Sequence, residues 1–118
     1  MARTMNDKRL IRTRAGSLLE LDDTGAPRIT LSTAAGHRVV LDEGEMAITL
    51  EHANGSVIRL SAAGEIEIRA AATVEVTAAA VNVHAPSASF DGIVSCTTLI
   101  ASSGVVSPSY TPGAGNVW

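Results

Sequence analysis

Apolar side chains occur along most of this chain in pairs that are separated by a single residue. The spacing of two is the period of a β-strand with one buried face, and no window between residues 16 and 84 has helical periodicity. The pairs are Leu19/Leu21, Ile29/Leu31, Val39/Leu41, Ile48/Leu50, Ile58/Leu60, Ile66/Ile68, Val74/Val76 and Val81/Val83. The pattern predicts an all-β chain of short strands, with these residues on the buried side.

Glycines recur in phase with the apolar pairs. Successive pairs are 10, 10, 9, 10, 8, 8 and 7 residues apart, and the glycines give a double repeat of 19 to 20 residues. The glycines in question are Gly16, Gly25, Gly36, Gly44, Gly55 and Gly64. Because glycine adopts positive φ at little cost, we expect a sharp corner at each of them.

The short intervals between strands restrict the architecture. One flat sheet would leave its apolar side and its edges exposed, whereas a β-solenoid or triangular prism would bury the apolar side. Either one chain completes a coil every three strands, or three chains each supply one face at each level. An up-and-down meander or sandwich is the alternative that we favour less. We expect an intertwined trimeric triple-stranded β-helix, in which strands lie between neighbours from other chains.

Composition supports a narrow interior. The chain is 46% hydrophobic but has one Phe, one Tyr and one Trp among its 118 residues. A slender prism has no room for rings, and all three aromatics fall near the end of the chain, at Phe90, Tyr110 and Trp118, together with Pro112. We expect these four residues to form a cap or tip, which either plugs the open end of the core or presents an apolar platform to a separate partner.

Charge divides the chain into three segments. Residues 1–15 are basic and form a solvated leader or a junction to a partner, residues 16–90 form the shaft, and residues 91–118 form the cap or tip. No Lys or Arg follows Arg69. A formal charge of −3 without a basic field argues against nucleic-acid binding. No signal peptide or apolar membrane span is evident.

Catalytic and metal chemistry are not indicated. Cys96 stands alone, which excludes an internal disulfide, and we expect it to be a small buried hydrophobe. The histidines are isolated at positions 37, 52 and 84, none within a nucleophile and acid motif. His84 could place three imidazoles around an axis, but a surface or corner position is the simpler expectation. We therefore expect no enzyme activity, no metal and no cofactor.

Residues 8–90 resemble a known family. Residues Arg12 to Asp23 fit the motif R-T-x-x-G-x-x-L-x-x-D-D, and the resemblance continues from Arg28 to Asp42. This part of the chain resembles the β-helical shaft in central spikes of contractile injection systems. These include phage baseplate assembly protein V, the valine-glycine repeat spike of type VI secretion and the spike of extracellular contractile injection systems.

The resemblance implies a mechanical function. It implies a homotrimeric structural needle on the axis of a tail or tube, driven through a target membrane when the sheath contracts. Its location would be the virion baseplate or an injection particle that is assembled in the cytoplasm. The implied partners are a baseplate hub or preceding barrel domain at the amino-terminal end and a PAAR-type tip protein at the carboxyl-terminal end. Short phage spikes of this kind close their tip with a His-x-His metal site, which this sequence lacks.

A second hypothesis remains open. A single-chain β-solenoid could polymerise end to end as a scaffold, or offer one flat face for binding. A carbohydrate-binding adhesin shaft is less consistent with the sequence, because it would expose aromatic stacking residues along its faces.

Overall fold

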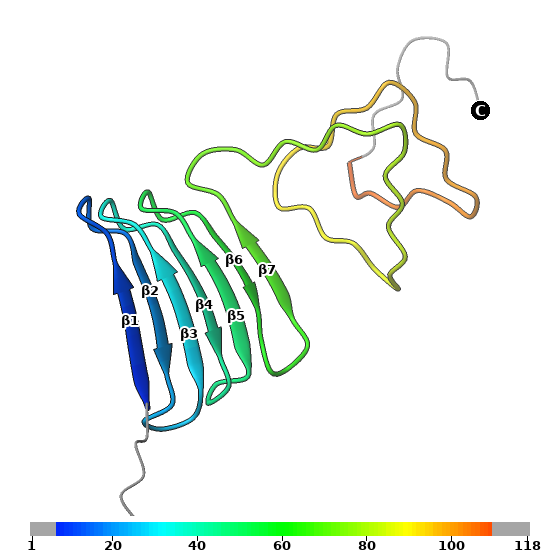
Figure 1. Cartoon of the computed structure of the whole chain (residues 1–118). Coiled ribbons are helices and arrows are strands. Elements are labelled where there is room, and N and C mark those ends of the chain that lie inside the picture. The colour runs from blue at the N-terminus through cyan, green and yellow to red at the C-terminus, as the bar shows by residue number, and fades with distance from the viewer. Residues whose placement is uncertain (1–6, 110–118) are drawn as a thin grey trace, which may run out of the picture. The chain divides into compact units, whose positions relative to one another are not determined.

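The described part of the protein is all-β, which confirms the all-β prediction (Figure 1). The computed structural model describes residues 7–109, and no helix occurs among them. Its strands are Lys8–Arg12 (β1), Leu18–Asp22 (β2), Arg28–Ser32 (β3), Arg38–Asp42 (β4), Ala47–Glu51 (β5), Val57–Leu60 (β6) and Ile66–Arg69 (β7). Each strand pairs antiparallel with the next, so the sheet has the order β1-β2-β3-β4-β5-β6-β7.

Six of the eight predicted strands are confirmed, since each of β2 to β7 carries one apolar pair. The structure adds β1, which lies in the segment that we expected to be a basic leader. Its apolar residues, Leu10 and Ile11, are adjacent rather than alternate, and cations surround them. Strand β1 forms because its backbone pairs with β2 over the full length of both strands.

The connectivity of the strands corrects one expectation. A coil completed by one chain every three strands is wrong for residues 8–69, because the strands form the up-and-down meander that we favoured less. Their neighbours within this sheet come from the same chain and not from other chains. The second arrangement, in which one chain supplies one face at each level, is compatible with this topology.

Four of the turns share one geometry, which explains why glycine keeps phase with the strands. Each turn has five residues, and the amide of the first donates a hydrogen bond to the carbonyl of the fifth. The carbonyl of the first residue accepts a hydrogen bond from the amide of the fourth, which is a glycine. All of these distances are 2.9–3.1 Å. The fourth residues are Gly16, Gly36, Gly55 and Gly64, with φ of 97°, 105°, 98° and 86°. A three-residue hairpin loop with a left-handed last residue has this form.

The prediction of positive φ at Gly25 and Gly44 was wrong. The connections at these two glycines are held by carboxylates instead. Asp22 Oδ1 accepts the amide of Thr24 at 3.0 Å, and Asp42 Oδ1 accepts the amide of Gly44 at 2.9 Å. In the second of these turns the left-handed residue is Met46, with φ of 51°. Aspartate side chains that bond to the backbone two residues on can replace a glycine corner.

The strands predicted at Val74/Val76 and Val81/Val83 do not form within this chain. Residues 70–109 have no regular secondary structure. The interval of 7 residues between these two pairs is shorter than any interval between pairs inside the sheet, the shortest of which is the 8 residues from β6 to β7. The chain divides into two compact units, with the boundary between Ala78 and Ala79.

Candidate interface on the apolar face of the sheet

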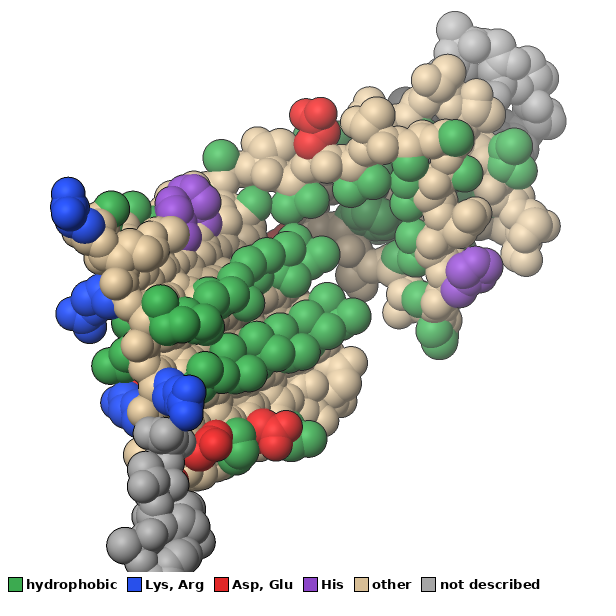
Figure 2. All heavy atoms as spheres, viewed as in Figure 1, with side chains coloured by type: hydrophobic (Ala, Val, Ile, Leu, Met, Phe, Trp, Pro, Cys, Tyr) green, Lys and Arg blue, Asp and Glu red, His purple; other side chains and the backbone are tan. Residues whose placement is uncertain are grey.

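Two rows of apolar side chains cross the sheet on one face, which we call the apolar face. The strand register aligns one residue of each strand in each row (Figure 2). The first row contains Ile11, Leu19, Leu31, Val39, Leu50, Ile58 and Ile68. The second contains Leu21, Ile29, Leu41, Ile48, Leu60 and Ile66, and begins with Arg9. Twelve of the predicted core residues therefore share one face.

The apolar face is uncovered in the single chain. Ten of the twelve row residues in β2 to β7 are exposed, up to 68% at Ile66, and Leu19 and Val39 are half-buried. Within residues 7–109, the buried hydrophobic side chains are Val40 and Ala47, and both lie on the opposite, polar face. Complete burial of a Leu or Ile side chain contributes roughly 1.5–3 kcal/mol. The chain alone leaves most of that free energy unrealised, which is typical of an interface.

Open grooves follow the first row. One groove, of about 370 Å³, is lined by the row residues of β1 to β4 and by the adjoining turns. Another, of about 500 Å³, lies at β5 to β7 and includes Val74 beside Leu50 and Ile58. The chain after β7 therefore crosses the end of the first row. This places Val74, one of the predicted core residues, next to the apolar face although it is not in a strand.

The polar face carries paired charges. Lys8, Asp22, Arg28 and Asp42 follow one another across β1 to β4 with alternating sign. Lys8 Nζ lies 3.1 Å from Glu20 Oε2. Lys8 Nζ also lies 3.9 Å from Asp22 Oδ2, and further ion pairs join Arg38 to Glu51 of β5 and Arg59 to Glu45 in the β4–β5 turn. Exposed pairs of this kind contribute little to stability, but they keep the polar face hydrophilic.

Asp22 has a specific environment on this face. The hydroxyl of Thr24 donates to Asp22 Oδ1 at 2.6 Å and lowers the pKa of the carboxyl group, and the amide of Thr24 acts in the same direction. The charges of Lys8 and Arg28 add to this effect on the pKa, which outweighs desolvation. Asp22 is therefore held as an anion and fixes the start of the β2–β3 turn.

Two of the three histidines contact each other in turns that lie at the same ends of the strands. The rings of His37 and His52, from the β3–β4 and β5–β6 turns, are 4.1 Å apart. His37 Nδ1 accepts the amide of Ala53 at 3.1 Å, and His52 Nδ1 accepts the amide of Asn54 at 3.1 Å. Each ring nitrogen is the acceptor for a backbone amide of a turn, so both histidines serve as turn caps.

Of the four predicted cap or tip residues, the structure describes Phe90. Phe90 is 72% exposed, whereas Tyr110, Pro112 and Trp118 lie outside the described residues. Val76, Val81 and Val83, predicted for the core, are also exposed and are not in the sheet. Cys96 is exposed in the single chain, so our expectation of a buried side chain was wrong for one chain alone. No side chain in residues 71–109 is buried.

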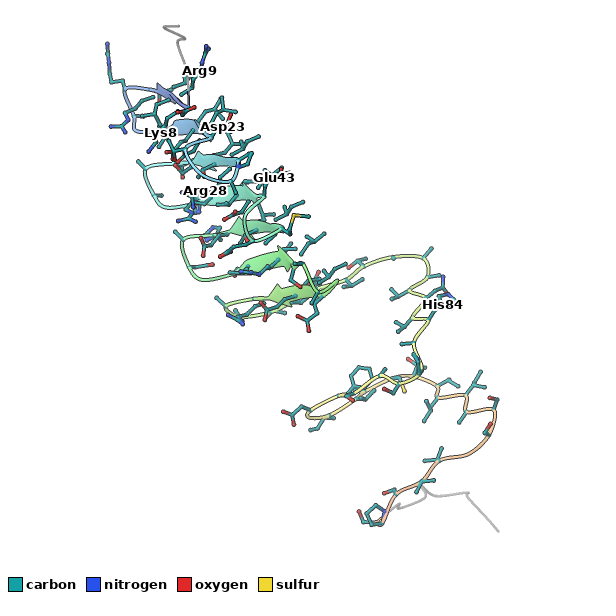
Figure 3. All side chains as sticks on the ribbon, turned by 90° about the horizontal axis from the view of Figure 1, so that it is seen from below. Lys8, Arg9, Asp23, Arg28, Glu43 and His84 are labelled. Carbon is teal, nitrogen blue, oxygen red and sulfur yellow. The ribbon has the colours of Figure 1, made fainter. Side chains whose placement is uncertain are left out.

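His84 belongs to the segment that follows β7 in the sequence and is not part of the sheet (Figure 3). Among residues 7–109, no three His, Cys, Asp or Glu side chains are grouped in a way that could hold a metal ion. That part of the chain also contains no helix with the length and apolarity needed to cross a membrane.

Sequence reasoning missed Ile11 and Arg9 on the apolar face. A signal was present, because Ile11 precedes Thr13 by two residues, as Leu31 precedes Thr33. Aligning the two Thr-x-x-Gly turns would have placed Ile11 in the first row.

Comparison with known families gives one match. The model of the phage baseplate V C-terminal trimerisation domain matches residues 28–87, just over half of the chain. The matched segment begins at the first residue of β3 and extends past the end of the sheet. No curated protein matches the chain.

Proposed function

Because the chain belongs to the phage baseplate V C-terminal trimerisation domain family, we propose that three copies form the rigid shaft of a contractile-tail spike that pierces a target membrane. The observation that carries this proposal is the uncovered apolar face, with two continuous rows of aliphatic side chains. A sheet with one apolar face needs a second apolar surface against it. In a homotrimer that surface is the same face of the other two copies.

Three such sheets fit the sides of a triangular prism. Their apolar faces meet on the axis, and the charged face, with Lys8, Asp22, Arg28 and Asp42, points to solvent. The interior then consists of Val, Ile and Leu at the levels of β2 to β7, which fits a core built without aromatic residues. Burial of half-exposed side chains in this way contributes about 1 kcal/mol for each.

The segment after β7 supports an intertwined arrangement of the chains. In the described part of this segment, residues 72–106 take part in no recorded backbone–backbone hydrogen bond. Buried backbone groups in native proteins are nearly all paired, so this apolar segment needs partner strands if it packs within a trimer. We propose that the two other chains supply them and that the triple-stranded β-helix begins after β7.

Such an assembly is suited to transmitting force. Every strand inside a prism is hydrogen-bonded on both sides and packed on its apolar side, so bending breaks many interactions together. We propose a structural rather than an enzymatic role, without a cofactor. The amino-terminal end would meet a baseplate hub or barrel, and the carboxyl-terminal end would carry a PAAR-type tip. The matched family favours a phage baseplate, and a type VI or extracellular injection machine would use the same mechanics.

The mass in solution tests the assembly. Light scattering on the full chain is expected to give about three times the 12.1 kDa mass of one chain. A monodisperse monomer would contradict the proposal. A concentration-dependent series of larger species would favour the alternative of an end-to-end scaffold, which at present no observation supports.

Two neighbouring residues in β5 provide a matched pair of variants. Leu50 lies on the apolar face and is 49% exposed in the single chain, whereas Thr49 lies on the polar face. Leu50→Asp should dissociate the trimer, because three carboxylates would enter one apolar core. Thr49→Asp should leave the mass unchanged. Equal tolerance of both changes would show that the apolar face is not the interface.

The role in the particle is tested separately from assembly. Contractile particles that carry an epitope-tagged chain are expected to bind antibody at the axial end of the baseplate in electron micrographs. Particles with Thr49→Asp should release dye from target-membrane vesicles on contraction, whereas particles with Leu50→Asp should not. Dye release without the trimer would exclude a piercing role.

A further inference from the structure

Strand β1 has one unpaired edge whose free backbone groups can be assigned. Thr13 donates its amide to Ser17, and Asp23 donates its amide to Asp7, so the hydrogen-bonded pairs between β1 and β2 fall at odd-numbered residues of β1. Pairs of this kind alternate along an antiparallel ladder. The amides and carbonyls of Lys8, Leu10 and Arg12 therefore point away from β2, at an edge where the described sheet ends.

This edge has an uneven charge. Lys8 is neutralised by Glu20 and Asp22 on β2, at 3.1 and 3.9 Å. For Arg9 and Arg12, and for Arg14 in the following turn, no ion pair is recorded within residues 7–109. All of β1 is exposed. Lys8 and Arg9 lie at the end of the stack of strands (Figure 3). The free edge thus combines unpaired hydrogen-bonding groups with uncompensated positive charge.

We propose that the free edge of β1 binds an acidic, extended strand from a partner protein, which adds an eighth strand to the sheet. The backbone groups of Lys8, Leu10 and Arg12 would form the ladder, as in other cases of β-strand addition. Side chains on the two faces of β1 would set the preference. Carboxylates beside Arg12 and Arg9 would gain opposite-charge neighbours, and an aliphatic residue beside Ile11 would extend the first apolar row.

A second copy of this chain is a poor occupant of the same edge. Two β1 strands side by side would bring the cations of both together, and like charges on adjacent strands are destabilising. Strand β7 at the other end of the sheet carries Glu67, but Arg69 already occupies that carboxylate at 2.9 Å. Charge complementarity therefore points to a different, acidic protein.

This inference stands apart from the membrane-piercing proposal. It concerns only how the amino-terminal end of the sheet is joined to another component, and the groups that it uses are present in a single chain. A failure of trimer formation would leave it intact, and its own failure would leave the trimer intact.

Hydrogen exchange with a defined probe tests the proposal. The probe is a blocked eight-residue peptide that alternates Glu with Val, and the control peptide has Lys in place of Glu. On addition of the acidic peptide to the full chain, the amides of Lys8, Leu10 and Arg12 are expected to exchange at least about tenfold more slowly, because they gain hydrogen bonds. The amides of Arg9 and Ile11, already bonded to β2, should not change.

Variants separate the contribution of charge to peptide binding from the contribution of the backbone hydrogen bonds. Arg12→Gln should weaken binding of the acidic peptide several-fold and reduce its salt dependence. Arg28→Gln is the matched control, because it removes the same charge from the polar face of β3, which has no free edge. Leu10→Pro should abolish binding by removing an outward amide, while the mass in solution and the circular dichroism spectrum remain those of the native protein.

The proposal is overturned by any of three results. The first is equal protection by the acidic and basic peptides, which would mean that charge has no role. The second is protection of the outward amides of β7, at Ile66 and Ile68, instead of β1. The third is concentration-dependent protection of β1 without peptide, which would identify a second copy as the occupant.

Discussion

Single residues at the turns determine where each strand of the sheet stops. Gly55 has a φ of 98°, a left-handed conformation that strains any residue with a Cβ atom, whereas Gly25 lies in an ordinary conformation. A Cβ atom added at either position would meet nothing within 4 Å. These two glycines therefore differ in backbone conformation alone, and the difference can be measured.

Gly55→Ala should lower the free energy of unfolding by roughly 1–2 kcal/mol per chain, because the alanine must take positive φ. Gly25→Ala should change it by no more than about 0.5 kcal/mol. Urea denaturation followed by circular dichroism gives both values. Equal effects of the two substitutions would mean that the left-handed conformation at Gly55 is not required in solution.

Asp22 predicts a dependence of stability on acid. Its pKa is lower in the folded chain than the ordinary value of 3.8, chiefly because of the Thr24 hydroxyl. A lowered folded pKa stabilises the fold above the unfolded value, and this contribution is lost as the pH falls through the folded value. The urea midpoint should therefore fall below about pH 4.

Two variants isolate the contribution of Asp22 to this acid response. Asp22→Asn should show a smaller fall in the urea midpoint over the same pH range. Thr24→Ala should also reduce the fall, because it removes the strongest hydrogen bond to the carboxylate. If both variants keep the full acid response, other carboxylates cause it.

At the scale of elements, alternation of apolar residues was enough to predict β2 to β7 and their shared face. It could not predict β1, where Leu10 and Ile11 are consecutive and pairing with β2 decides the structure. It also could not separate Val74/Val76 from the earlier pairs, because alternation reports which residues share a face but not which chain provides the hydrogen bonds. The signs of that change were the shortening intervals and the absence of glycine between Gly64 and Gly92.

Neighbouring turns are coupled as well as neighbouring strands. His37 caps the amide of Ala53 across two turns, and its ring contacts His52. His37→Ala should therefore raise the exchange rate of the Ala53 amide several-fold, which corresponds to loss of about 1 kcal/mol of local stability. His84→Ala, outside the sheet, is the control. No change at Ala53 would mean that the turns are independent.

For the whole molecule, residues 70–109 distinguish one chain from three. Those amides have no regular pairing within the chain, so in a monomer they should exchange as fast as an unfolded peptide. In the proposed trimer the amides around Val76, Val81 and Val83 should be protected at least about a hundredfold. Hydrogen exchange with mass spectrometry on the native protein, and on Leu50→Asp as the dissociated control, measures this difference.

The candidate interface was partly accessible from the sequence. The row residues of β2 to β7 could be named, because their spacing is regular, but their exposure could not be predicted, since burial depends on how many chains contribute to the core. The polar-face residue Val40 shows the converse. It is among the few buried side chains of the single sheet, although it belongs to no alternating apolar pair.

The matching turns at Asp22 and Asp42 make the sheet modular. Residues 23–42 comprise one complete unit of two strands and two turns, so their removal would join Asp22 directly to Glu43 and restore the same connection one unit earlier. Every remaining side chain would keep its face. The sheet would shorten by about 10 Å, two strand spacings, without any new junction. Length can therefore be gained or lost in whole units, so the spike that we propose could be matched to the thickness of the barrier in front of it.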